Sequence, residues 1–155
     1  MAKSAILRRG EVSDIDGVKA CIDQAYMSYI PRIGKRPASM DTDFEPLLHE
    51  GRVWVLEYDS RIVGTMALIE GPGFLEIRSV AVLPEYQRKG LGQRLMLHAE
   101  TTAREARCAR LRLYTNAGIP ELVTYYSKLG YCEEARKHDA GYDRVFLTKL
   151  LLPDG

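Results

Sequence analysis

Residues 79–92 read Ser79-Val80-Ala81-Val82-Leu83-Pro84-Glu85-Tyr86-Gln87-Arg88-Lys89-Gly90-Leu91-Gly92 and carry the strongest structural signal in the chain. The apolar run before Pro84 predicts the end of a strand, and the two glycines open an apolar repeat of helical spacing. The first turn of a helix leaves about four N–H groups unpaired beside roughly half a positive charge, which favours an anion such as a phosphate. Because glycine lets the main chain approach a ligand closely, this turn is predicted to hold a phosphate.

Hydrophobic periodicity on both sides of this turn predicts the other elements. We expect strands at residues 5–8, 53–58, 61–69, 74–82, 111–115, 131 onward and 143–151. We expect helices starting near residue 13 and at residues 44–48, 91–106 and 120–130, with a basic loop from Pro31 to Ala38. The order β-α-α-β-β-β-α-β-α-β-β indicates an α+β or mixed α/β domain built on one central sheet.

Length and charge narrow the class of protein. The chain has 155 residues, which suits a single domain, 1–155, since domains most often contain ~100–150 residues. Its formal net charge is +1, so no overall field attracts nucleic acid or an anionic membrane. Residues 86–112, however, include seven basic and two acidic side chains. We interpret this local excess as suited to one phosphorylated cofactor rather than to a polymer.

Cysteine and histidine usage argues against a disulfide framework and against a metal site. The three cysteines are far apart and odd in number, and no two of the three histidines have the i, i+4 spacing of metal ligands. The chain shows no apolar segment of ~7–15 residues typical of a signal peptide, and no apolar run of ~18 residues. We therefore expect a cytoplasmic protein with no metal and no membrane partner.

Two separated motifs resemble those of a known family. The pattern Gln-x-x-Gly-x-Gly at residues 87–92, placed between a strand end and an amphipathic helix, resembles the acyl-CoA-binding motif of the GNAT superfamily of N-acetyltransferases. Residues 116–131 look like the family's strand-end Asn, the following helix and its Tyr-x-x-x-Gly-aromatic ending. The resemblance extends over roughly residues 5–150 when the element order is included. One departure is that Leu122 or Val123 stands where many members have Ala.

The resemblance implies both a fold and an activity. The fold is a mostly antiparallel, twisted sheet of about seven strands flanked by about four helices. The activity is direct attack by a neutral primary amine, on a small molecule or a protein, on the thioester of acetyl-CoA. A tetrahedral oxyanion would form against the backbone of Ala81 and Val82 before the CoA thiolate leaves. The implied cofactor-binding residues are Val80, Ala81, Val82, Gln87, Arg88, Lys89, Gly90, Leu91, Gly92, Gln93, Asn116 and Tyr126.

Acetyl transfer needs a proton donor and a proton acceptor. By resemblance Tyr126 would protonate the thiolate, because a phenol with a pKa of ~10 is protonated at neutral pH; its alternative role is packing on the sheet. A lysine-like amine costs about 4–5 kcal/mol to deprotonate at pH 7, so a base or a water chain is expected. Glu76 is the candidate base, since members often draw one from this strand, and its alternative role is an ion pair with Arg78. Further candidates for the base are Glu70, Asp143 and Glu45.

The motifs leave the acceptor and the assembly open. In the family, Tyr26, Tyr29, Arg32 and the 31–38 loop would form one wall of the acceptor site, and residues 138–144 the other. Two alternative functions are a non-catalytic acyl-CoA-binding regulator and a toxin-like acetyltransferase that acts on aminoacyl-tRNA. The near-neutral net charge argues against the latter, because nucleic-acid binding rests on several phosphate contacts. A homodimer is expected from family habit, with residues 146–151 as a contact through a strand edge.

Overall fold

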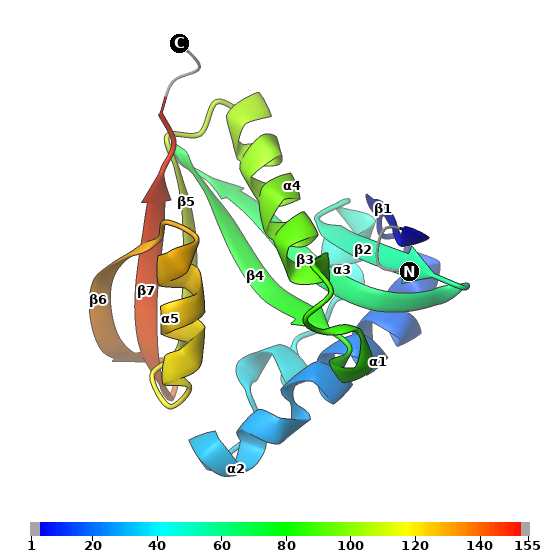
Figure 1. Ribbon diagram of the computed structural model, residues 1–155, viewed down its shortest axis with the longest axis horizontal. Coiled ribbons are helices and arrows are strands. Elements are labelled where there is room, and N and C mark those ends of the chain that lie inside the picture. Colours follow the sequence, from blue (N-terminus) through cyan, green and yellow to red (C-terminus); the bar gives the residue numbers. More distant parts are fainter. Residues whose placement is uncertain (1–3, 153–155) are drawn as a thin grey trace.

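One sheet of seven strands runs through residues 4–152, the part of the chain that the computed structural model describes (Figure 1). In chain order the strands are β1 (Ile6–Arg9), β2 (Val53–Tyr58), β3 (Arg61–Gly71), β4 (Phe74–Val82), β5 (Arg110–Asn116), β6 (Cys132–Asp139) and β7 (Tyr142–Leu150). Across the sheet they lie in the order β1-β2-β3-β4-β5-β7-β6. Only β4 and β5 pair in parallel, so the expected mostly antiparallel sheet is confirmed.

Five α-helices accompany this sheet: α1 (Ile15–Tyr26), α2 (Ile30–Ile33), α3 (Glu45–His49), α4 (Leu91–Glu105) and α5 (Pro120–Lys128). Both α1 and α4 contact β3 and β4, so this part of the sheet is packed between helices. Figure 1 shows α4 and α5 on one side of the sheet, over β4 and β7. The predicted apolar stripe of α4 is confirmed, because Leu91, Leu95 and Ala99 are buried in the core. None of the helices in residues 4–152 is long and apolar enough to cross a membrane.

The hairpin between β2 and β3 has the predicted two-residue connection. Asp59 and Ser60 have φ values of 51° and 60°, the left-handed conformation that a type I′ turn needs at both central residues. This turn type matches the twist of the flanking strands and sets Tyr58 opposite Arg61. The two-residue connection expected between these strands is therefore confirmed.

The sheet splits between β4 and β5. These strands pair only from Phe74 with Arg110 to Glu76 with Arg112, and they diverge beyond that point (Figure 1). Ser79 has a φ of 56°, and the register between β3 and β4 shifts here, so β4 contains one extra residue. Such a β-bulge bends a strand and increases its twist, which directs residues 80–82 away from β5.

Two expectations for the segment before β2 are wrong. Residues 30–33 form the short helix α2 where a loop was expected, because Pro31 lies in the first turn and needs no N–H donor there. The chain leaves this helix at Gly34, whose φ is 85°. The first long helix also begins later than residue 13, since residues 12–14 form a 3₁₀ turn before Ile15.

The expected edge contact at residues 146–151 is also wrong. Most of this segment belongs to β7, which lies between β5 and β6 and pairs with both. The exposed edges of the sheet are instead β1 and β6, and every residue of β6 is exposed. A partner that adds to the C-terminal half of the sheet would therefore meet β6.

Candidate active site

A cavity of about 130 Å³ lies in the split between β4 and β5. Side chains from α1 and the turn after it, from the two diverging strands, from α5 and from β7 line it. We call it the split cavity; among its lining residues are Tyr26, Tyr29, Ser39, Ile77, Arg78, Ser79, Val80, Leu113, Tyr114, Asn116, Leu122, Tyr126, Tyr142 and Arg144. Its position brings the predicted residues Val80, Asn116 and Tyr126 together, although 46 residues separate the first from the last.

The glycine turn at the start of α4 has the geometry of an anion site. Gly90 is left-handed with a φ of 83°, and Arg88 before it has a φ of 63°. The first helical bond runs from Arg94 N to Gly90 O, so the N–H groups at the helix start have no helical acceptor. No acidic residue lies in the first turn, and the side chains of Arg88 and Lys89 are exposed beside it. These residues fit a phosphate group of a bound cofactor.

Two side chains hold the end of β4 where the cofactor motif begins. The Gln87 side chain donates a hydrogen bond to Val82 O at 3.0 Å, and the Tyr26 hydroxyl donates one to Val80 O at 2.7 Å. Gln87 therefore braces the main chain as well as flanking the turn. Leu91 is buried in the core, so only its main chain can reach a ligand, whereas the Gln93 side chain is exposed.

Tyr126 projects from α5 into the split cavity. The residue is 9% exposed, and its ring packs edge-on against Tyr125 and Tyr131, with centroids 5.2 and 6.0 Å away. Burial, helped by the neighbouring Tyr125 and Tyr29 hydroxyls, raises the pKa of Tyr126 above its ordinary value of 10.0. The hydroxyl is therefore protonated throughout the neutral range, as a proton or hydrogen-bond donor must be.

Tyr125 lies on a different side of α5 from Tyr126. Its hydroxyl is 3.3 Å from the position that a Cβ on Gly92 would occupy, so it spans the space between α5 and the start of α4. The absence of a side chain at Gly92 leaves room for this contact. Tyr125 thus belongs to the glycine turn rather than to the split cavity.

Tyr126, the other predicted catalytic residue, lines the split cavity, but Glu76 does not. It lies on the part of β4 that is still paired with β5, opposite Arg112. Its carboxylate accepts a hydrogen bond from Arg78 Nε at 2.6 Å, and Arg78 does line the cavity. The ion pair that we considered as the alternative role for Glu76 is therefore present.

Asn116 stabilises the turn that follows β5. Its Oδ1 accepts a hydrogen bond from Gly118 N at 2.8 Å, which closes the turn before α5. The residue also lines the split cavity, so it lies between that cavity and the expected acceptor walls.

The two expected acceptor walls contact each other. Tyr142 donates a hydrogen bond to Arg36 O at 2.5 Å, and Lys35 lies 4.0 Å from the centroid of the Tyr142 ring and donates to Gly141 O. A second cavity of about 330 Å³ lies between these walls and shares Ile33, Asn116 and Tyr142 with the split cavity. The segment after α2 and the β6–β7 turn thus form one enclosure on the acceptor side.

Arg32 links that enclosure to α5. Its two terminal nitrogens donate to the two carboxylate oxygens of Glu121 at 2.5 and 2.6 Å. This hydrogen-bonded pair lowers the pKa of Glu121 to about 2. Both side chains are well exposed, so the pair orients α2 on α5 rather than contributing a large stabilisation.

The sequence motifs gave no role to Ser79, named Arg78 only as a partner of Glu76, and included Arg144 only as the last residue of an expected acceptor wall. Ser79 forms the bulge and its hydroxyl hydrogen-bonds to that of Ser39 at 2.8 Å. Arg144 is 11% exposed, although an arginine on a final strand is usually solvated. The only signal in the sequence is strand alternation, which places Arg78 and Arg144 on the sheet face opposite the buried Ile77 and Val145.

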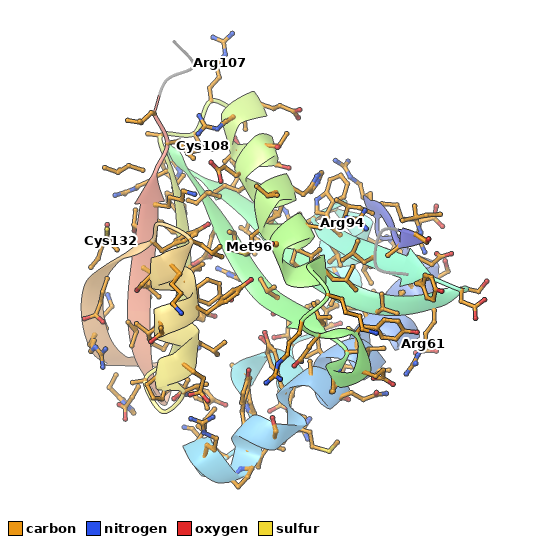
Figure 2. The ribbon with its side chains drawn as sticks, viewed as in Figure 1. Arg61, Arg94, Met96, Arg107, Cys108 and Cys132 are labelled. Atoms are coloured by element: carbon orange, nitrogen blue, oxygen red, sulfur yellow. The ribbon has the colours of Figure 1, made fainter. Side chains whose placement is uncertain are left out.

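The interpretation of the basic residues between 86 and 112 is corrected by their positions. Only Arg88 and Lys89 flank the glycine turn, whereas Arg107 lies at the far end of α4 (Figure 2). Arg94 donates to Ala5 O at 2.7 Å, and Arg104 donates to Leu152 O at 2.8 Å. The local excess of charge is therefore dispersed over the glycine turn, α4 and the start of β5 rather than gathered at one anion site.

Cysteine and metal chemistry have no built site in the described residues. Cys21 and Cys108 are buried, Cys132 is exposed on β6, and all three are free; in Figure 2 Cys108 lies in the connection between α4 and β5, apart from Cys132. Within residues 4–152 no group of three or more His, Cys, Asp or Glu side chains could hold a metal ion.

Comparison with known proteins gives consistent matches. The model of the acetyltransferase (GNAT) family matches residues 22–131. The N-acetyltransferase YjgM of Escherichia coli K12 is 28% identical over 138 residues, which cover 83% of each chain. PaiA N-acetyltransferase from Thermoplasma acidophilum, solved in complex with coenzyme A, has a TM-score of 0.80 at 20% identity and covers 96% of this chain and 99% of its own. A GNAT-family acetyltransferase from Staphylococcus aureus Mu50 has a TM-score of 0.79 at 17% identity, with coverage of 96% and 100%.

Proposed function

Because this chain belongs to the acetyltransferase (GNAT) family, we propose that it transfers the acetyl group of acetyl-CoA to a primary amine in the split cavity. Family membership confirms the expected activity class, an acetyl-CoA-dependent acyltransferase. The observation that carries the proposal is the placement of Tyr126 in a cavity beside Val80, while the glycine turn that follows this strand at the start of α4 suits an anion. A regulator without turnover would not need this tyrosine in the cavity.

Acetyl-CoA would be held along the split. The main-chain N–H groups at the start of α4, with Arg88 and Lys89 beside them, suit the pyrophosphate. Residues 80–82 lack a strand partner on the β5 side, so their main chain suits the pantetheine arm and the thioester. The N–H of Leu83 bonds to Val63 O on β3, so alternation along the strand points the N–H of Ala81 to β3 and that of Val82 into the split. The backbone N–H of Val82 is therefore our proposed donor to the thioester oxygen as charge develops on it.

The reaction itself exchanges one bond for another. The nitrogen lone pair of the amine forms a C–N bond with the carbonyl carbon, and the C–S bond breaks with its electron pair left on sulfur. The nitrogen loses one proton, and the sulfur gains one. We assign the second role to Tyr126, whose buried, protonated hydroxyl donates to the sulfur as it leaves.

For the proton lost by the amine, Glu76 remains our candidate acceptor. Its carboxylate lies beside the cavity and is hydrogen-bonded to Arg78, so a water molecule must carry the proton between them. Glu76→Gln should lower kcat while acetyl-CoA affinity stays unchanged. A normal kcat for this variant would remove Glu76 from the mechanism.

A thiol-release assay tests the proposed function. The protein is mixed with acetyl-CoA and a broad panel of amines, while calorimetry with acetyl-CoA alone measures binding. Amine-dependent release of CoA thiol, with acetylated amine detected by mass spectrometry, supports the enzyme. Binding without release over the whole panel would favour the regulator. Acetylation of aminoacyl-tRNA with a steep salt dependence would favour the third function.

Assembly and location complete the proposal. We infer that any homodimer of this chain forms through β6, the exposed edge strand of the C-terminal half. Sedimentation velocity tests this: Arg136→Glu should dissociate such a dimer, and an unchanged dimer would place the contact elsewhere. Free cysteines and a cofactor of central metabolism suit a cytoplasmic location, which cell fractionation would check.

A further inference from the structure

The charged side chains of the split cavity are all of one sign. Two arginines, Arg78 and Arg144, line it, and its lining contains no Asp or Glu among the described residues. The adjoining cavity adds Arg32 and Lys35, and its one acid, Asp143, lies 2.9 Å from His138. An acceptor amine in the split cavity therefore meets no carboxylate among its described lining side chains.

Both cavity arginines are braced from outside the cavity. Asp139 accepts from Nη1 of Arg144 at 2.9 Å, and Glu76 accepts from Nε of Arg78 at 2.6 Å; neither acid lines the split cavity. The Arg144 guanidinium also lies 4.1 Å from the centroid of Tyr114. In residues 4–152, Nε and Nη2 of Arg144 and Nη1 of Arg78 have no acceptor. The guanidinium groups are thus held in place with donors to spare.

These arginines lie on the acceptor side of the split. They alternate along β4 and β7 with the buried Ile77 and Val145, so they project from the sheet face opposite α4 and α5. The glycine turn begins α4 and belongs to the other side. The cofactor phosphates are therefore not the partners of Arg78 and Arg144.

We propose that the acceptor is a small amine that also carries a carboxylate, with Arg144 as its main anchor and Arg78 as a second contact. This proposal rests on the proposed acetyl transfer. Arginine binds planar carboxylates through paired N–H donors, and a guanidinium that is mostly buried and already oriented loses little freedom on binding. Polyamines and lysine-rich segments carry extra cations, which the same charges repel. The contacts that join the two acceptor walls suit a small molecule rather than a folded protein.

The first arm of the test compares matched acceptors. Wild-type protein is assayed by thiol release with L-amino acids, with the corresponding amino acid amides, with spermidine and with a peptide that has a free N-terminus. The acids should exceed their amides at least tenfold in kcat/KM, because a charge-assisted pair is lost in the amide. A preference for spermidine or for the amides would overturn the proposal while leaving acetyl transfer intact. No release with any amine would instead count against the proposed function.

The second arm uses arginine variants. Arg144→Gln should raise KM for the carboxylate acceptors about tenfold or more, while KM for acetyl-CoA and for the amide stays within twofold. Arg144→Lys should recover part of the loss, since lysine keeps the charge but not the paired donors. Arg78→Gln provides a second, more exposed test position, and Arg52→Gln, which removes an arginine that pairs with Glu50 outside both cavities, is the matched control. Equal losses for acid and amide would show a purely structural role and overturn the assignment.

Discussion

Burial of the Tyr126 ring fixes the state of its hydroxyl. Because the pKa is raised above 10.0, the phenol stays neutral at every pH at which the enzyme would work. It can donate a hydrogen bond or a proton to the departing sulfur, but it cannot serve as a base. The raised pKa therefore suits Tyr126 to the role of proton donor and leaves the role of proton acceptor to Glu76, our candidate base.

Tyr126→Phe removes the hydroxyl and keeps the ring. We expect kcat to fall roughly a hundredfold, in the range of general acid–base effects, with no change in acetyl-CoA affinity. Steady-state kinetics and calorimetry measure the two quantities. Tyr125→Phe is the matched control on the same helix, and it should keep kcat because its hydroxyl faces Gly92. Equal effects of the two changes would contradict the assignment.

The pH profile provides a second check on Tyr126. Since its pKa lies above 10.0, loss of its proton cannot lower kcat/KM below about pH 10. We expect kcat/KM to rise with pH as the amine loses its proton, with no falling limb up to pH 9.5. A falling limb between pH 8 and 9 that disappears in Tyr126→Phe would show that the hydroxyl ionises there.

Asp14 should make stability depend on pH. Hydrogen bonds from Arg8 lower its pKa, so the carboxylate stabilises the fold above its unfolded pKa of ~3.9 and loses this effect as the pH falls through the folded value. Asp14→Asn should therefore destabilise the protein at pH 7 and progressively less below pH 4. Urea unfolding over this range measures the difference. Asp16→Asn removes an exposed carboxylate two residues away and should show a smaller, flatter difference.

The start of α4 can be tested by replacing Gly90 and, as a control, Gly34, which has the same backbone conformation at the end of α2. Gly90 and Gly34 have φ values of 83° and 85°, and a Cβ atom added to either glycine would have open space around it. Alanine at either position costs about 1–2 kcal/mol in the left-handed region, which corresponds to a few degrees in Tm. Only Gly90→Ala should also weaken acetyl-CoA binding. Similar losses of affinity in both variants would mean that the turn does not hold the cofactor.

Local patterns in the sequence predict the elements well where geometry is decided locally. The bounds of β2 and β4 agree with the expected 53–58 and 74–82, because alternation, Asp59-Ser60 and Pro84 delimit them. The helix at 30–33 escaped prediction because Pro31 reads as a breaker unless its place in the first turn is known. The order of strands is set by long-range pairing, so nothing local revealed that β7 inserts between β5 and β6.

The parts of the site that depend on main-chain conformation were predicted better than those that depend on single side chains. The glycines and Tyr126 follow fixed spacings, and the structure gathers them around the split as expected. Ser79 could not be identified, since it depends on a bulge that no residue type indicates. Arg144 was expected only as part of the 138–144 wall, because its place beside β5 depends on the strand order. For Glu76 the sequence predicted the strand and offered two roles, and the structure shows the ion pair with Arg78 but no place among the residues that line the split cavity.

For the whole molecule, acetyl-CoA should act as a stabilising ligand of the split. Binding at 100 times Kd adds about 2.7 kcal/mol to the free energy of unfolding, so Tm should rise by several degrees. Hydrogen exchange should slow in residues 77–82 and at the start of α4, where the unpaired main chain lies. Protection confined to β6 and β7 would place the ligand elsewhere.

The short contact between β4 and β5 has a mechanical consequence. The pairing from Phe74–Arg110 to Glu76–Arg112 and the hydrogen bond from Ala109 N to Gly73 O join the two halves of the sheet at one end, so we expect the sheet to bend there as at a hinge. Opening at this hinge would move the proposed acetyl-CoA site and the proposed acceptor site together. A ligand that stiffens one site therefore reduces the conformational entropy that is lost when a ligand binds at the other. Cofactor and acceptor should then favour each other's binding reciprocally without touching, a coupling built into the sheet itself.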